Sequence, residues 1–441
     1  MKLADIMEKA FSLLKKKSID QFEIFGIFSD AIRAEAKNGE VDFLNRSSES
    51  GISIRILMDG AIGFSYGKEA TDSLIEAALT SAKYQFKDEH NCFPDPKDGY
   101  PGINVYDENI KLMGPDDCIQ RAIQLEVAAR GADPRVENIR KASCSRSSSQ
   151  VQIINSHGVN ASFNVTSVAA SLMVTVRQDS DVQSGYDFDF SHLLQGFNVE
   201  KVGRSAVSHA VDLLGARQLK TTKIPVLFDR MTTAEMIEFI SAAFLGENVI
   251  KGKSSLKDKL GKKCFSECIV LSDNPLDIRA ADACPFDGEG VPSRNTVLVK
   301  GGLVTAFLYD TYWASVAGAQ SSGNSIRSGF RSWPSLGIRH LCVEPSHEPV
   351  YRHLADLPLV LKVTDIMGMH TANPITGELS VGINGILLEK GNPAYAVRET
   401  ALSGNIYEMF SRVLAVGDDP RSFGNVLCPS ILVDSVDISS Q

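Results

Sequence analysis

One short run in the sequence matches the pattern of a nucleophilic serine, G-x-S-x-G, at residues 63–67. Such an elbow requires a buried strand that leads directly into a sharp turn and a helix. Here the run follows Asp59 and Gly60, a pair that predicts a hairpin turn. We therefore expect Ser65 to be a surface residue on the return strand of a hairpin, without a catalytic role.

The histidines do not have the spacing of a zinc hydrolase. Such an enzyme places two histidines one helical turn apart with a glutamate beside the first, and the sequence contains no H-E-x-x-H or H-E-x-x-x-H run. The nearest approach is the His-Glu pair at residues 347–348 with His353. Six helical residues rotate the second imidazole away from the first, and Pro349 prevents a regular helix there.

Two further pairs of potential ligands are isolated. Cys264 and Cys268 lack the second pair of thiols that a zinc site needs. Asp365 and His370 are five positions apart, so neither a helix nor a strand brings them to one face. We therefore expect no metal ligand and no catalytic residue in this chain.

Three glycine-rich polar segments remain, at residues 285–293, 319–327 and 368–378. Loops of this kind can place backbone amides against a ligand or an extended peptide. The alternative is ordinary turn chemistry between strands. The candidate residues of a substrate groove are Asp287, Glu289, Gly290, Ser322, Gly323, Gly368, His370 and Thr371.

The periodicity of apolar residues predicts an α+β protein rich in antiparallel sheet, with N-terminal α/β domains followed by a β-rich C-terminal domain. Asn38-Gly39 and Asp59-Gly60 predict two hairpins. A polar segment at residues 87–112, rich in Pro, Gly, Asp and Asn, predicts a linker or long loop. No internal repeat is apparent. The expected domains are an α+β unit at 1–105, a second α+β unit at 113–217 and a β-rich unit at 222–441.

Composition limits the partners and the compartment. The chain of 441 residues has a formal net charge of -9 and no clustered run of Lys and Arg, which argues against nucleic acid as a direct partner. The amphipathic N-terminus is not a signal peptide, and no stretch approaches the roughly 20 apolar residues that span a bilayer. Eight scattered cysteines are typical of reduced thiols, so we expect a cytoplasmic protein without a membrane partner.

Taken in order, the motifs resemble the TldD/PmbA family, on its PmbA (TldE) side, nearly from end to end. The N-terminal part carries the runs KNGEV at 37–41, GISIR at 51–55 and DGAIGF at 59–64. The more specific C-terminal runs are GENV at 246–249, KSSL at 253–256, LGK at 260–262, PFDGEGV at 285–291, SSGN at 321–324, GMHTANPITGELSVG at 368–382 and LSGN at 402–405.

The resemblance implies a cytoplasmic proteolytic complex of one TldD-type and one PmbA-type subunit. The TldD-type chain holds zinc with an H-E-x-x-x-H helix and a cysteine. Its implied substrates are unfolded or extended peptides, including ribosomally made peptides being matured and an antitoxin. The family label "modulator of DNA gyrase" would then describe an indirect effect.

This chain departs from the zinc-binding pattern. The matching helix, at residues 236–244, has Glu238 and Ser241 where the TldD side has its histidines, and residues 343–427 contain no cysteine. We therefore expect a subunit without zinc that pairs, mainly through residues 222–441, with a TldD-like chain or with itself and completes a peptide chamber. The alternatives are a homodimeric peptide-binding module without a protease partner and an enzyme with an unrecognised site around Asp287, Glu289 and His370.

Overall fold

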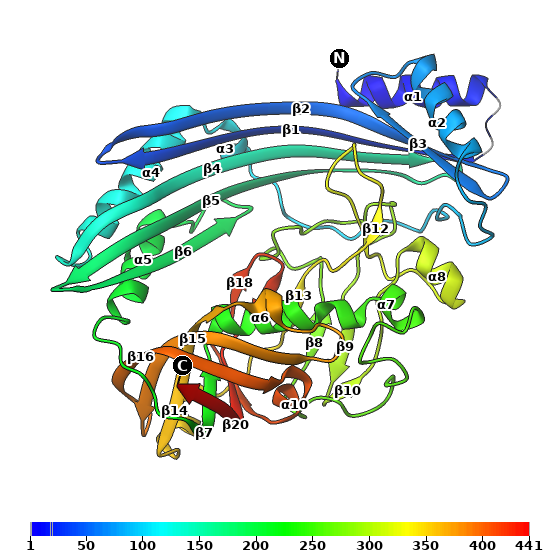
Figure 1. The fold of residues 1–441 in the computed structure, drawn as a ribbon. Coiled ribbons are helices and arrows are strands. Elements are labelled where there is room, and N and C mark those ends of the chain that lie inside the picture. Colours follow the sequence, from blue (N-terminus) through cyan, green and yellow to red (C-terminus); the bar gives the residue numbers. More distant parts are fainter. Residues whose placement is uncertain (1, 18, 20, 441) are drawn as a thin grey trace.

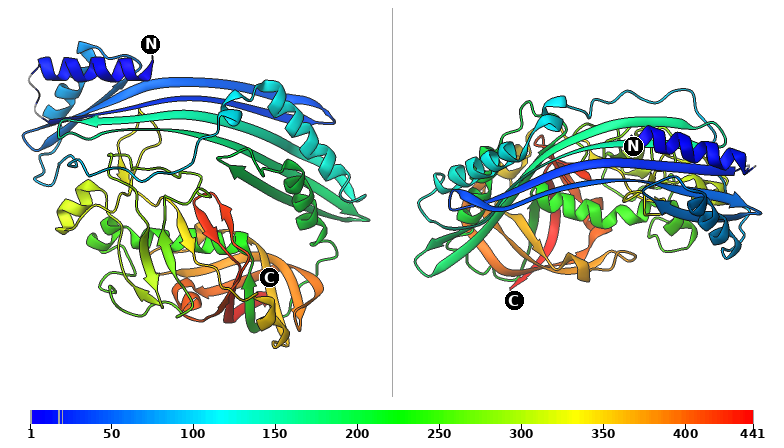
Figure 2. Two further views of the ribbon diagram at one scale, coloured as in Figure 1. Left: turned by 180° about the vertical axis from the view of Figure 1, so that it is seen from behind. Right: turned by 90° about the horizontal axis from the view of Figure 1, so that it is seen from above.

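The computed structural model describes residues 2–17, 19 and 21–440. One long antiparallel sheet arches over a β-rich C-terminal half, and the views from behind and above show that the sheet extends across that half (Figures 1 and 2). The α+β, antiparallel-rich class predicted from the sequence is confirmed.

The first two units have the following elements. The first consists of α1 (Leu3–Lys16), β1 (Gln21–Lys37), β2 (Glu40–Met58), β3 (Ala61–Gly67) and α2 (Asp72–Lys83). The second consists of α3 (Glu108–Leu112), α4 (Pro115–Arg130), β4 (Val136–Asn155), β5 (Asn160–Gln178), β6 (Asp181–Ser191) and α5 (Val199–Val211).

The C-terminal part contains many short elements. In chain order they are β7 (Thr222–Phe228), α6 (Arg230–Ser241), η1 (Ala242–Phe244), α7 (Gly246–Ile250), β8 (Leu271–Asp273), β9 (Thr296–Lys300), β10 (Leu303–Val304), α8 (Thr311–Ala317), β11 (Ser325–Ile326), β12 (Ser335–Leu336), β13 (Leu341–Val343), α9 (Tyr351–Ala355), β14 (Leu359–Met367), η2 (Met369–Thr371), β15 (Glu378–Glu389), β16 (Asn392–Asn405), α10 (Ile406–Ser411), β17 (Val413–Val416), β18 (Arg421–Phe423), β19 (Val426–Cys428) and β20 (Ile431–Ser440).

The two N-terminal units share a single sheet, with the strand order β3-β2-β1-β4-β5-β6. Its centre is the antiparallel pair β1 and β4, in register from Glu23 opposite Asn155 to Ala36 opposite Ala142. Each unit contributes three strands, so neither has a complete sheet without the other. The segment between α2 and α3 is irregular, and it is packed down, since Asn155 Nδ2 donates to the Pro94 carbonyl at 2.8 Å.

The first hairpin forms as its residues predict. Asn38 and Gly39 have φ values of 55° and 79°, the left-handed conformation that a type I′ turn requires at both central positions. Alternate residues of β1 then separate the two faces of the sheet. Phe22 and Ile24 pack under α1 and α2, and Ile32 packs near α4 at the other end of the same face. The helices therefore cover one face, and the opposite face is turned toward the C-terminal half.

The two N-terminal units repeat one topology, helix-strand-strand-strand-helix, although the sequence shows no repeat. In each unit a glycine on the third strand lies under the final helix. A Cβ atom at Gly63 would lie 1.9 Å from the Ala78 carbonyl oxygen of α2, and one at Gly185 would lie 2.1 Å from the Ala206 carbonyl oxygen of α5. Both contacts therefore require glycine, because any side chain would collide with the helix backbone.

Ser65 corrects one expectation from the sequence. It is 8% exposed, not a surface residue, and its Oγ donates to the Leu74 carbonyl oxygen at 2.7 Å. The physical reason is that α2 folds back across β3 and covers the face that carries Gly63 and Ser65. The hydroxyl is therefore a buried donor used in helix packing, and the hairpin topology still lacks the elbow of a nucleophilic serine.

Two six-stranded sheets and helix α6 form the C-terminal core. One sheet has the order β16-β15-β14-β7-β20-β17, and β16 also pairs with β20. The other sheet has the order β10-β9-β8-β13-β19-β18. Helix α6 runs between them, as Figure 1 shows, and contributes Met236, Ile237 and Ile240 to their shared core. The apolar residues of α6 thus face inward on both sides.

Candidate functional site

The residues expected to line a peptide groove fall into two separate groups. One group lies in the connection between β14 and β15, where Gly368 is half-buried and His370 and Thr371 are exposed. Thr371 Oγ1 donates to the Gly368 carbonyl oxygen at 2.8 Å, which closes this connection into a turn. The other group is buried on the side of the N-terminal sheet that faces the C-terminal half, and it consists of Asp287, Glu289, Gly290, Ser322 and Gly323.

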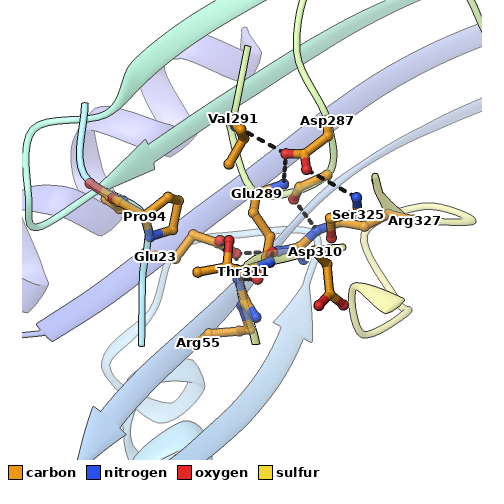
Figure 3. A network of polar contacts seen from close by, with 12 residues as sticks. Glu23, Arg55, Pro94, Asp287, Glu289, Val291, Asp310, Thr311, Ser325 and Arg327 are labelled. Carbon is orange, nitrogen blue, oxygen red and sulfur yellow. Dashed lines mark hydrogen bonds and ion pairs between the residues drawn. The ribbon is translucent and has the colours of Figure 1, made fainter. Parts of the chain in front are cut away.

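A buried network of charged side chains joins the N-terminal sheet to the loop at residues 285–293 (Figure 3). Arg55 on β2 donates through Nε to Glu23 Oε1 at 3.0 Å and through Nη2 to Glu289 Oε1 at 2.9 Å. Arg327 also pairs with Glu23. Burial opposes the negative charge on Glu23, but the two arginines outweigh this effect and lower its pKa.

Two further buried carboxyls belong to the same network. Asp287 accepts hydrogen bonds from three backbone N–H groups, including that of Ser325 at 2.9 Å. Asp310 caps α8 by accepting from the Trp313 backbone N–H at 2.8 Å. Burial, and next the negative charge of Glu289, raises the pKa of both Asp287 and Asp310 to about 7. The protein's own donors occupy these carboxyls. We call this network, made of Glu23, Arg55, Asp287, Glu289, Asp310 and Arg327, the clamp, because it joins the N-terminal sheet to the C-terminal half.

Two of the buried glycines serve close packing within this clamp. Gly290 has a φ of 83°, and a Cβ atom there would lie 2.6 Å from Val159 Cγ1 of the second N-terminal unit. At Gly323, with a φ of 79°, a Cβ atom would lie 3.0 Å from the Pro292 carbonyl oxygen. In the isolated chain these glycines thus approach the protein's own backbone and side chains.

A cavity of about 980 Å³ lies between the N-terminal sheet and the C-terminal half, at the start of α6. Its volume is near the upper end of ligand pockets in proteins, roughly 300–1,000 Å³. Within it, Asn384 Nδ2 donates to Asp365 Oδ2 at 3.1 Å. The lining is mixed and includes the apolar residues Leu213, Tyr351, Leu354 and Tyr395 and the polar residues Asp229, Lys362, Thr364, Asp365 and Asn384.

The accessible side of α6 carries two carboxylates, and the helix contains no histidine. Glu238 is exposed and Ser241 is half-buried, while Glu235 is half-buried near Asp365 and Asp229. Burial, followed by the negative charges of Asp365, Asp229 and Glu238, raises the pKa of Glu235 to about 7. A carboxyl with such a pKa can exchange a proton at neutral pH. Glu235 was not among the residues predicted from the sequence. The pattern that could have indicated it is its position three residues before Glu238 on the same helix.

The fold also assembles three potential metal ligands that sequence reasoning did not connect. Asp277, His340 and Cys342 each offer a ligand atom, and these atoms lie within 4.8 Å of one another. His340 and Cys342 alternate along β13 and its flank, so both side chains leave the same face of the sheet. Asp277 lies on a loop 63 residues before His340 in the chain. Because of this separation, residue spacing in the sequence does not indicate that the three ligands meet.

The part of the chain that the structure describes contains no helix that is both long and apolar enough to cross a membrane. Among the same residues, the eight cysteines form no disulfide. Cys264 is half-buried and Cys268 is exposed.

Comparison with known proteins agrees across the whole chain. Residues 22–83, 108–214 and 221–440 match domain 1, the central domain and the C-terminal domain of the PmbA/TldA metallopeptidases. The chain is 25% identical to "Metalloprotease PmbA" of Escherichia coli O157:H7, covering 100% of this chain and 96% of the relative. It is 27% identical to a PmbA homologue of Haemophilus influenzae, covering 92% and 90%.

Two solved structures have the same fold. One is a putative modulator of DNA gyrase from Thermotoga maritima, with a TM-score of 0.91 and 23% identity over 99% of this chain and 100% of the other. The second is TldE from Thermococcus kodakarensis, with a TM-score of 0.89 and 24% identity over 98% and 100%. The chain therefore belongs to the PmbA/TldD metallopeptidase family and is of the PmbA/TldE type.

Proposed function

We propose that this chain is the PmbA/TldE-type subunit of a two-chain cytoplasmic metallopeptidase that cleaves unfolded or extended peptides. In this complex a TldD-like partner holds the catalytic zinc, and the present chain completes the chamber in which peptides bind. The observation that carries the proposal is the composition of α6, which has carboxylates and apolar residues and no histidine.

The side chains of α6 do not by themselves fit a catalytic zinc ion. Such an ion is held by three protein ligands, with histidine predominant, and keeps one open position for water. Glu235 and Glu238 are the carboxylates of α6, and neither lines the cavity. The cysteine nearest in the fold to the start of α6 is Cys428, which is buried and directs its thiol to the Arg230 carbonyl oxygen at 3.2 Å. We therefore route no step of hydrolysis through α6 of this chain.

The cavity of about 980 Å³ is the surface that this chain would contribute to a peptide chamber. Its apolar residues suit side chains of an unfolded peptide, and Lys362 and Asn384 offer donors to peptide carbonyls. Asp365 and Asp419, which also line the cavity, add negative charge, which favours basic or neutral segments over acidic ones. His370 and Thr371 are exposed and would meet a peptide only outside the buried clamp.

The test compares this chain, a TldD-like chain from the same organism, and an equimolar mixture. We expect the mixture to elute as one complex and to cleave an unfolded, fluorescently labelled peptide, with loss of cleavage after chelation and recovery with zinc. This chain by itself should not cleave the peptide. Chelator-sensitive cleavage by the lone chain, after removal of contaminating proteases, would contradict the proposal.

A second measurement separates the proposal from its main alternative. If the chain binds labelled peptide as a homodimer, and adding a TldD-like chain changes neither its mass by light scattering nor its peptide affinity, it is a binding module without a protease partner. We expect the mass to change, because the cavity and the exposed part of the β14–β15 connection would then be completed by the second subunit.

A further inference from the structure

We propose that Asp277, His340 and Cys342 form a binding site for one divalent transition-metal ion of the zinc class. The site is separate from α6. Leu341 and Val343 of β13 point into the core that α6 shares, whereas His340 and Cys342 leave the other face of that strand. The inference does not depend on the proposed peptidase partnership.

The backbone around the site is held firmly. The backbone N–H of His340 donates to Asp273 Oδ1 at 2.6 Å. The backbone carbonyl oxygen of His340 accepts a hydrogen bond from the Asn274 N–H at 2.7 Å. The Asp277 N–H in turn donates to the Asn274 carbonyl oxygen at 3.2 Å, which forms the turn that returns Asp277 toward β13. The three ligands therefore come from a paired strand and a closed turn, which limits the cost of arranging them.

The histidine side chain is the observation that points to a ligand. His340 is 0% exposed, and neither ring nitrogen has a hydrogen-bond partner among the residues that the structure describes. A buried polar group without a partner costs roughly 1–3 kcal/mol, and such groups are rare in folded proteins. A metal ion would use one nitrogen lone pair of this imidazole. A bound metal ion would thus give a partner to one of the two ring nitrogens that have none among the described residues.

The donor set selects the class of metal. A thiolate, an imidazole and a carboxylate together suit zinc and related late transition metals, whereas magnesium and calcium favour oxygen ligands alone. Bond lengths of about 2.0–2.3 Å place the ligand atoms of a tetrahedral zinc roughly 3.3–3.8 Å apart. The present separations, all within 4.8 Å, require a closure of about 1.5 Å at most.

An arginine at the surface hydrogen-bonds the carboxylate of the site. Arg279 donates to both oxygens of Asp277, through Nε at 2.9 Å and Nη2 at 2.6 Å, and its side chain is 56% exposed. Hydrogen-bonded carboxylates of this kind commonly serve as metal ligands. Arg279 also borders a cavity of about 340 Å³ with Ser422 and Leu427, and Leu427 lies opposite Cys342 in the sheet.

An occupied site would stabilise the junction between the two halves of the protein. The loop that carries Asp277 continues to Ala280, whose carbonyl oxygen lies 2.8 Å from Nε2 of His192, just after β6. The same loop leads into residues 285–293, which form the clamp with the N-terminal sheet. Metal binding to this loop would therefore stabilise its closed state against opening, with an effect that grows with metal concentration.

The test uses the full chain, reduced and freed of metal, titrated with Zn²⁺ or with Co²⁺ as a spectroscopic probe. We expect one equivalent to bind, a thiolate-to-cobalt charge-transfer band, and a rise in Tm that increases with Zn²⁺ concentration. The variants Cys342→Ser and His340→Ala should bind at least about tenfold more weakly and lose the band. The matched controls Cys268→Ser and His353→Ala, which change exposed residues elsewhere, should behave like the unaltered protein.

Binding well below one equivalent by the unaltered chain would overturn the proposal, as would equal loss in the control variants. If His340→Ala fails to fold, Cys342→Ser and Asp277→Asn decide the matter, because both keep the size of the side chain. Their Tm without metal should match that of the unaltered chain. Their failure to respond to Zn²⁺ would support the site, and an unchanged response would refute it.

Discussion

The guanidinium of Arg55 and the carboxylate of Glu289 are 234 residues apart in the chain, yet Arg55 Nη2 lies 2.9 Å from Glu289 Oε1. Both side chains are 5% exposed, and Arg55 also pairs with Glu23 on the neighbouring strand. This contact joins the N-terminal sheet to the C-terminal half across a buried interface. Separating the halves would leave charges partly uncompensated, so the contact makes their association specific.

The first prediction concerns this clamp. Arg55→Met removes the positive charge between Glu23 and Glu289 and should lower the free energy of unfolding by about 3–5 kcal/mol, because two buried carboxylates then share Arg327 alone. Denaturant unfolding of the chain measures the loss. The matched control is Arg331→Ala, whose pair with Glu49 is more than half exposed and should contribute less than about 1 kcal/mol. Equal effects of the two substitutions would contradict the clamp.

The second prediction concerns pH. The pKa of Asp310 is raised to about 7 in the folded protein, above its value of about 3.9 in an unfolded chain. Between these values the folded state holds a proton that the unfolded state has lost, so Asp310 makes stability fall as pH rises from about 4 to 7. Asp310→Asn keeps an equivalent helix cap and removes the ionisation.

The variant Asp310→Asn should therefore equal the unaltered chain near pH 4 and exceed it at pH 8, by an amount of the order of 2 kcal/mol. Unfolding curves at several pH values provide the measurement. A difference between the two proteins that stays constant with pH would show that Asp310 does not titrate in this window.

The third prediction concerns Ser65. Ser65→Ala removes the hydrogen bond to the Leu74 carbonyl and should cost roughly 1 kcal/mol of stability. Peptidase activity of the complex, measured per folded molecule, should remain within about twofold. Thr71→Ala, which removes the N-cap of the same helix, serves as a control with a similar loss of stability. A fall in activity of several orders of magnitude would restore the serine-nucleophile hypothesis.

The fourth prediction concerns the two glycines beneath the final helices of the N-terminal units. Gly63→Ala and Gly185→Ala should each destabilise the protein by roughly 1–3 kcal/mol or more, because the added methyl group collides with helix backbone. Gly102→Ala is the control, since its added Cβ meets no described atom within 4 Å. Thermal unfolding distinguishes these variants, and equal Tm values for all three would contradict the packing argument.

The fifth prediction concerns His370. If the exposed β14–β15 connection contacts peptide and not the reacting atoms, His370→Ala should raise KM of the complex more than it lowers kcat. Lys9→Ala, on the exposed side of α1, should change neither constant. A large fall in kcat at unchanged KM would instead place His370 close to the chemistry.

The sequence by itself determined the family, the α+β class and the local turns. Asn38-Gly39 specifies its hairpin because both residues adopt positive φ at low cost, and this preference is local. The apolar spacing of Leu3, Ile6 and Met7 likewise predicts the buried face of α1. Motif order identified the PmbA/TldE type for the same reason, since it depends on residue identity alone.

Only the tertiary structure decided which residues from distant parts of the chain come into contact. Ser65 is buried because α2 returns over its strand, and Glu289 pairs with Arg55 because the sheet arches over the C-terminal half. Asp277 meets His340 and Cys342 through a turn and a strand separated by 63 and 65 positions. Such contacts depend on packing between distant segments, and neither helical nor strand periodicity extends across the loops that separate them.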